Sequence, residues 1–195
     1  DQERLLEWAY ACWPGGGTPR FFPNSLKKWL KTVQPISSGQ FVNPGWPAPV
    51  NQYMNHIWFK LLWDVDTDID ADLADYCQKL YGPAAKPMEA FFKGCIKRWE
   101  NTRWSREIPH WYVPAALMYG ETFNAKAVAD MERSLDEAKA AVAKVPDSIY
   151  ARRVTTFRNQ FQNFIDNAKS IHHVLDKKLV YDVNSVNQAS LKDFN

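Results

Sequence analysis

The fold class is decided by residues 51–99, NQYMNHIWFKLLWDVDTDIDADLADYCQKLYGPAAKPMEAFFKGCIKRW. Its apolar residues recur at steps of three and four on both sides of an acidic turn, which is the spacing of amphipathic helices. Gly82 stands where a left-handed C-cap is expected, and Pro83 can open the helix that follows. The pattern therefore predicts three successive helices, over residues 51–63, 69–81 and 84–101.

The flanking sequence adds further helices and one short strand. Pro23-Asn24-Ser25 offers an N-cap, and Asn124 offers another. The turn residues Pro146-Asp147-Ser148 separate the last two helical patterns, which read as an antiparallel hairpin with a short connection. The strand is expected at Gln40–Val42. The additional helices are expected over residues 3–12, 25–33, 125–142 and 149–177.

These elements define a mainly α fold, a helical bundle with irregular aromatic-rich loops and a short strand remnant near the N-terminus. We expect three parts along the chain. Residues 1–50 form an irregular segment that looks like the end of a barrel, residues 51–178 form the helical bundle, and residues 179–195 form a C-terminal arm. The aromatic-rich loop is expected over residues 102–123.

Composition excludes several classes of protein. Among 195 residues, 46% are hydrophobic and 24% are charged, and the net charge is +2, which argues against a disordered chain and against a basic face for nucleic acid. No apolar run approaches the roughly 20 residues that span a bilayer. The first residue is Asp1 rather than Met, which suggests a processed or trimmed start. Cys12, Cys77 and Cys95 have no close spacing, and we expect Cys77 and Cys95 to be small buried side chains rather than a disulfide.

Two blocks of sequence carry a resemblance to a known family. The first is Tyr53–Phe92, centred on LLWD at 61–64 and YGPAA at 81–85; the second is Asn124–Phe161, where LDEA at 135–138 precedes YARRV at 150–154. Together they resemble the C-terminal helical region of the domain-of-unknown-function family 4838, whose members look like glycoside hydrolases.

The resemblance implies a carbohydrate-active protein with a barrel that carries the catalytic carboxylates, and an extracytoplasmic or secreted location. A full barrel needs on the order of 200 residues or more, whereas about 50 precede the bundle here. We therefore expect this chain alone to lack a complete catalytic barrel, so that enzyme activity of the chain itself stays open.

Candidate site residues come from the loops. Glycosidases use two carboxyl groups, and the candidates outside helix surfaces are Glu107, Glu121 and Asp64. Glu107 and Glu121, both in the aromatic-rich loop, are the pair predicted to be catalytic, although a solvated loop carboxylate is the ordinary alternative. Aromatic residues make up 14% of the chain, with nine Trp, and such rings either pack a core or stack on sugar rings. The residues expected to contact substrate are Trp13, Asn43, Trp46, His110 and Trp111.

The alternating acidic run DVDTDIDAD begins at Asp64. Asp64, Asp66 and Asp68 match the first three ligand positions of a calcium loop, but Ile69 replaces the glycine at position six. Acidic residues also gather at helix N-termini, where the helix dipole favours them. The helix-terminus interpretation is favoured, calcium at these three residues is the alternative, and no other metal or cofactor is expected.

Three hypotheses about function remain open at this stage. The first is the C-terminal helical portion of a glycoside hydrolase-like enzyme that contributes to glycan binding. The second is a stand-alone carbohydrate-binding module without catalysis, and the third is a structural or oligomerisation helical domain. The expected partners are a glycan or oligosaccharide, and either a second copy of the chain or an upstream catalytic domain; no nucleic acid and no membrane are expected.

Overall fold

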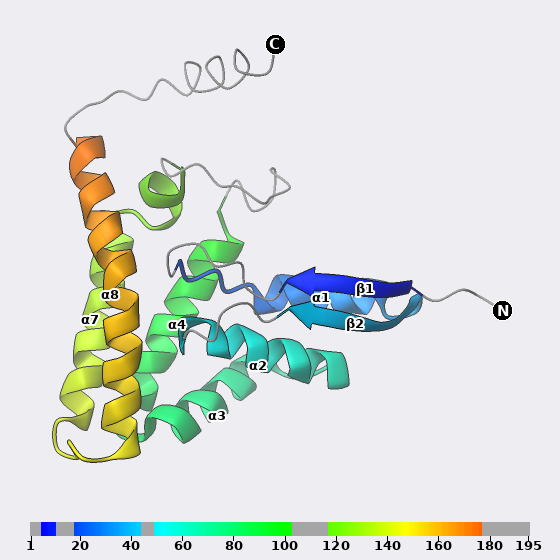
Figure 1. Ribbon diagram of the computed structural model, residues 1–195, viewed down its shortest axis with the longest axis horizontal. Helices are drawn as coiled ribbons and strands as arrows, with labels where there is room; N and C mark the ends of the chain where they lie inside the picture. Colours follow the sequence, from blue (N-terminus) through cyan, green and yellow to red (C-terminus); the bar gives the residue numbers. More distant parts are fainter. Residues whose placement is uncertain (1–4, 11–17, 44–48, 103–116, 177–195) are drawn as a thin grey trace, which may run out of the picture.

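The computed structural model describes residues 5–10, 18–43, 49–102 and 117–176. The fold is mainly α, as the sequence predicts (Figure 1). The two longest helices form a hairpin at one end of the molecule, and a small sheet with its covering helix lies at the other. The expected C-terminal arm, residues 179–195, lies outside the described residues.

The prediction of a helix at the start of the chain is wrong. A helix is predicted over residues 3–12, but Leu5–Tyr10 form strand β1, which pairs in parallel with strand β2, Ser37–Asn43. The register runs from Leu5 opposite Ser37 to Tyr10 opposite Asn43, with an irregularity after Leu5. Parallel strands need a long crossover connection, and the helix between β1 and β2 supplies it, so the first part of the chain is a β–α–β unit.

That crossover is helix α1, Pro23–Val33, and its N-terminus is capped from a distant part of the chain. The expected local cap is absent: the residue before the helix is Phe22, whose side chain makes no capping bond. Instead the Glu100 carboxylate accepts hydrogen bonds from the backbone N–H groups of Asn24 and Ser25, at 2.8 and 2.9 Å, and from the Asn24 amide at 2.8 Å. A carboxylate at a helix N-terminus satisfies unpaired N–H groups and the helix dipole together.

The central layer consists of α2, Pro49–Trp63, and α3, Ile69–Tyr81. Asp68 caps α3 by accepting a hydrogen bond from the Ala71 N–H at 3.0 Å, which confirms the helix-terminus interpretation of this residue. Strand β2 is fastened to α2 because the Trp58 indole N–H donates to Gln40 Oε1 at 3.0 Å.

Gly82 is the C-cap of α3 with a φ of +51°, but it does not adopt the predicted left-handed conformation. Its ψ of −111° differs from the ordinary left-handed value, and the chain passes through a short 3-10 turn, Gly82–Ala84, into helix α4, Ala85–Glu100. A side chain at Gly82 has no room, because a Cβ built there lies 2.9 Å from the Tyr150 ring. The turn therefore brings α8 and the end of α3 into close contact.

The predicted hairpin is confirmed as α7, Ala125–Val142, and α8, Ile149–Asp176. Asn124 caps α7 through a hydrogen bond from the Ala127 N–H at 3.0 Å. An ion pair between Lys169 and Glu132, 2.6 Å apart, joins the two helices on their solvent side. Such exposed pairs contribute little stability, so the hairpin is held mainly by its apolar face.

The core is unusually aromatic. Rings from α2, α4 and α8 meet around Phe92, whose centroid lies 5.3 Å from that of Tyr53 in a tilted arrangement and 5.6 Å from that of Phe157 in an edge-to-face arrangement. Cys77 and Cys95 are buried and not disulfide-bonded, as predicted. Much of the aromatic content in the described residues is therefore used in packing, and the ring that most clearly departs from this is Trp63, which is 95% exposed.

Candidate functional site

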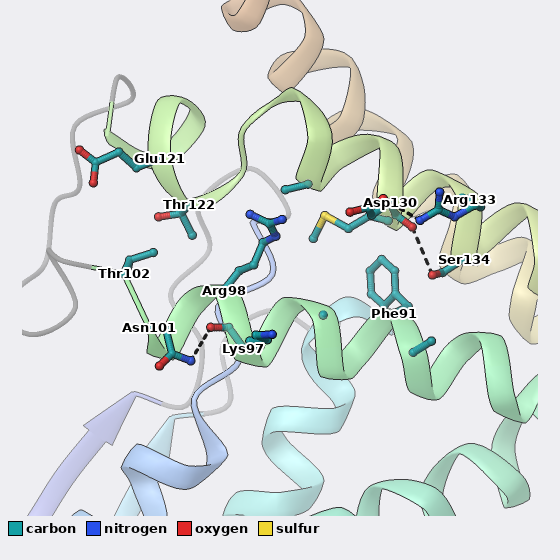
Figure 2. Close-up of a pocket in the computed structure, with 14 residues that line it drawn as sticks. Phe91, Lys97, Arg98, Asn101, Thr102, Glu121, Thr122, Asp130, Arg133 and Ser134 are labelled. Atoms are coloured by element: carbon teal, nitrogen blue, oxygen red, sulfur yellow. Dashed lines mark hydrogen bonds and ion pairs between the residues drawn. The ribbon is translucent and has the colours of Figure 1, made fainter.

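A cavity of about 640 Å³ opens between α4 and α7, and it is the largest described pocket (Figure 2). Its volume lies within the range of about 300–1,000 Å³ that small-molecule sites occupy. Polar and charged side chains line much of it. The lining residues are Ala90, Phe91, Gly94, Lys97, Arg98, Asn101, Thr102, Glu121, Thr122, Ala127, Asp130, Met131, Arg133 and Ser134.

One wall of the pocket is a single turn of π-helix, η2, Met118–Thr122. The Phe123 N–H donates to the Met118 carbonyl at 2.8 Å, the five-residue step that defines such a turn. The loop expected over residues 102–123 is therefore regular in this part. Single π-turns occur frequently at functional sites, and this one contributes Glu121 and Thr122 to the pocket.

His172 on α8 holds this turn in place. Its Nε2 lies 2.9 Å from the Tyr119 carbonyl oxygen and 2.8 Å from that of Phe123. Because both neighbours are acceptors, Nε2 must carry the proton that they share. His172 is buried, and it connects the far end of α8 to the turn that carries Glu121.

Charges inside the pocket are unevenly paired. Asp130 lies 2.8 Å from Lys126 Nζ and 2.6 Å from Arg133 Nη2, and these contacts, Lys126 first, hold its pKa below the ordinary value. In Figure 2 the Glu121 carboxylate points away from Arg98, and Glu121 interacts with another group of the protein. Arg98 points from α4 toward α7 and makes no hydrogen bond or ion pair within the described part of the chain.

The sequence-predicted site residues are only partly located. Glu121 lies at the rim of the pocket, and Asn43 is the last residue of β2. The other candidates lie outside the described residues, so the Glu107–Glu121 pairing stays a prediction. These are Trp13, Trp46, Glu107, His110 and Trp111.

The calcium alternative finds no support in the acidic turn. Asp68 caps α3, Asp64 Oδ1 accepts from the Asp66 N–H at 2.9 Å, and Asp66 pairs with Lys31, which lowers the pKa of the Asp66 carboxyl. Within the described ranges, no three His, Cys, Asp or Glu side chains gather as a metal site. The three carboxylates thus serve the helix start and its contact with α1.

A second polar cluster joins α2 to α3. The Asp72 carboxylate, 3% exposed, lies 3.0 Å from His56 Nε2 and 2.9 Å from Lys60 Nζ. The hydrogen bond to Asp72 raises the pKa of Lys60. No described cavity reaches these three side chains, so we interpret the cluster as a structural link between the two helices.

Sequence reasoning missed Arg98 and His172 as site residues. A signal for the pocket exists on α4, where Ala90, Gly94 and Arg98 follow one another at four-residue steps and so share one helix face. Because Ala90 and Gly94 have small or no side chains, they leave space beside Arg98, and α7 packs across that space to form the pocket.

Comparison with family models, with curated proteins and with solved structures found no match for this chain. Among the described residues, no helix is both long and apolar enough to cross a bilayer. The function is therefore argued from the pocket and the β–α–β unit.

Proposed function

We propose that this chain is the C-terminal helical portion of a glycoside hydrolase-like, carbohydrate-active protein, and that it contributes to glycan binding. The observation that carries the proposal is the parallel β1–α1–β2 unit attached to the helical bundle. This is the repeating unit of α/β barrels, and it stands at the place where the family resemblance puts the end of a barrel.

The sheet itself favours a larger parent structure. Two strands alone are marginally stable, and parallel sheets are almost always covered on both faces. Here Leu6 on β1 is 74% exposed and Phe41 on β2 is 57% exposed. We infer that further parallel strands and helices cover these side chains in the complete protein, and that the catalytic carboxylates belong to that part.

The direct test is a glycan-binding panel on the purified chain, read by quenching of tryptophan fluorescence. We expect saturable quenching by a subset of glycans and no hydrolysis by this chain alone. A flat response across plant, bacterial and host glycans would remove the binding role. If hydrolysis is observed, Glu121→Gln must abolish it for the carboxylate assignment to hold. If the protein is instead a stand-alone carbohydrate-binding module, we expect the same binding of glycans but no hydrolase activity in the full-length protein.

A structural or oligomerisation role is the second candidate, and one surface favours it. Phe59, Leu62 and Trp63 lie together at the C-terminal end of α2, all exposed. Clustered exposed apolar side chains are typical of contact surfaces. Sedimentation of the chain and of its Trp63→Ser variant separates the two candidates, because an oligomer that uses this surface dissociates in the variant while glycan binding does not require it.

A further inference from the structure

We propose that the α4–α7 pocket binds an acidic oligosaccharide, with the Arg98 guanidinium holding a sugar carboxylate. The inference rests on the proposed glycan-binding function and names the ligand class. Three properties of the pocket support this proposal. It contains a partly buried arginine without an ion-pair partner among the described residues, its acidic residues do not neutralise that arginine, and its floor is formed by small residues.

Arg98 is the first property. It is partly buried, lies on the pocket-lining face of α4, and points toward α7 (Figure 2). No carboxylate or carbonyl among the described residues accepts a hydrogen bond from it. A guanidinium offers planar paired donors that match a carboxylate in a two-bond geometry, so the side chain is arranged to take an anion from outside the chain.

The acidic residues of the pocket do not compensate Arg98. Asp130 is paired with both Lys126 and Arg133, at 2.8 and 2.6 Å. The Glu121 carboxylate is directed away from Arg98 (Figure 2). Lys97 adds a second cation on the same side of α4. The space between α4 and α7 therefore carries a positive excess, which favours a negatively charged ligand.

The floor of the pocket leaves room for a ring-sized ligand. Gly94 lies one helical turn before Arg98, and a Cβ built on it meets no atom within 4 Å. Ser134 lies at the pocket wall, where its hydroxyl donates to the Asp130 carbonyl at 3.2 Å and so presents its oxygen as an acceptor for a sugar hydroxyl. Asn101 lines the same wall, and its amide donates to the Lys97 carbonyl at 2.8 Å. The cation selects the carboxylate, and the surrounding polar groups select the sugar that bears it.

The test is isothermal titration of the chain with trimers of galacturonate, glucuronate and mannuronate, beside neutral trimers of the parent sugars and inorganic sulfate. We expect at least one uronate trimer to bind more tightly than its neutral counterpart. Arg98→Gln should weaken that binding about 10- to 100-fold, because a charge-assisted hydrogen-bond pair is lost. Arg98→Lys should recover part of it, since the charge returns without the paired geometry.

Two further variants separate pocket binding from general charge and from misfolding. Gly94→Leu fills the pocket without changing any charge and suits a helix better than glycine, so it should abolish binding in a folded protein. Lys86→Gln removes the same charge from an exposed position on α4 outside the pocket, and should leave binding within about twofold. Urea unfolding of each variant verifies that it folds.

Each outcome separates the two proposals. Equal binding of uronate and neutral trimers, or undiminished uronate binding by Arg98→Gln and Gly94→Leu, overturns the Arg98 site but leaves glycan binding intact. Sulfate that competes with the trimers at similar concentration shows a general oxyanion site and overturns the sugar assignment. No binding of any saccharide, in this titration or in the glycan panel, overturns the proposed function as well.

Discussion

Gly82→Ala gives the sharpest test of how the bundle is held together. Two independent costs meet at this residue. Its φ of +51° with ψ of −111° lies outside the conformations that residues with a Cβ adopt readily, and occupying such a region costs about 1–3 kcal/mol. The new Cβ also lies 2.9 Å from Cδ2 and Cε2 of Tyr150, and overpacking of this kind costs about 1–3 kcal/mol.

The expected loss is therefore about 2–6 kcal/mol in the free energy of unfolding, the sum of these two ranges. Urea unfolding followed by circular dichroism measures it, with the denaturant midpoint falling and the slope unchanged. Gly94→Ala is the matched control, because that glycine lies inside α4 with open space around its Cβ position. The control should gain about 0.4–1 kcal/mol.

A double variant divides the loss between its two causes. In a Tyr150→Ala background the ring no longer meets the added Cβ, so Gly82→Ala should cost only the backbone part. Complete recovery in that background would show that backbone strain contributes nothing, and no recovery would show that the ring contact contributes nothing. A Gly82→Ala chain as stable as the parent would refute the whole account of this turn.

Three other perturbations have expected outcomes. Asp68→Ala should cost about 1 kcal/mol in urea unfolding, since it removes the α3 cap; calcium added to the parent chain should leave its urea midpoint unchanged, and a rise would revive the calcium alternative. Leu135→Ala, at a fully buried position of α7, should cost about 2–5 kcal/mol through lost burial and the cavity left behind. Burial raises the pKa of Cys77 to about 12 from 9.0, so its thiol should resist alkylation at pH 8 until urea unfolds the chain. Because the pKa of the Cys77 thiol is higher in the folded chain than in the unfolded chain, the neutral thiol contributes its full stabilisation below pH 9.0. That stabilisation is lost as the pH rises from 9.0 toward 12, so the urea midpoint should fall over this pH range.

Helices with all their signals nearby in the sequence could be predicted closely. α3 begins and ends at the predicted residues because Asp68 supplies a cap and Gly82 supplies the exit, with apolar residues spaced between them. The hairpin of α7 and α8 follows in the same way from Asn124 and the turn before Ile149.

The misses occur where the deciding partner is distant. Leu5, Leu6 and Ala9 have a spacing that fits a helix, but β1 forms because β2, about 30 residues later, pairs with it. The N-terminus of α1 is capped by Glu100, 76 residues from Asn24. Neither contact leaves a local pattern, since each joins residues that are far apart in the sequence.

The candidate site shows the same division. Glu121 could be selected from sequence as a loop carboxylate, but the π-turn that carries it depends on His172, more than 40 residues further along and on another helix. Arg98 looks like an ordinary solvated residue on the polar side of a helix, and it becomes a pocket residue only when α7 packs across that side.

Gly94 connects the stability of α4 to the proposed binding. A glycine inside a helix costs about 1 kcal/mol relative to alanine, and at this position no neighbouring atom requires the missing side chain. Packing therefore gives no reason for the glycine, whereas a ligand lying over it would. The single change Gly94→Leu should then raise the free energy of unfolding and remove uronate binding together. If the variant is more stable and binds the trimer unchanged, the ligand does not occupy the space above Gly94, and the pocket has to be reassigned.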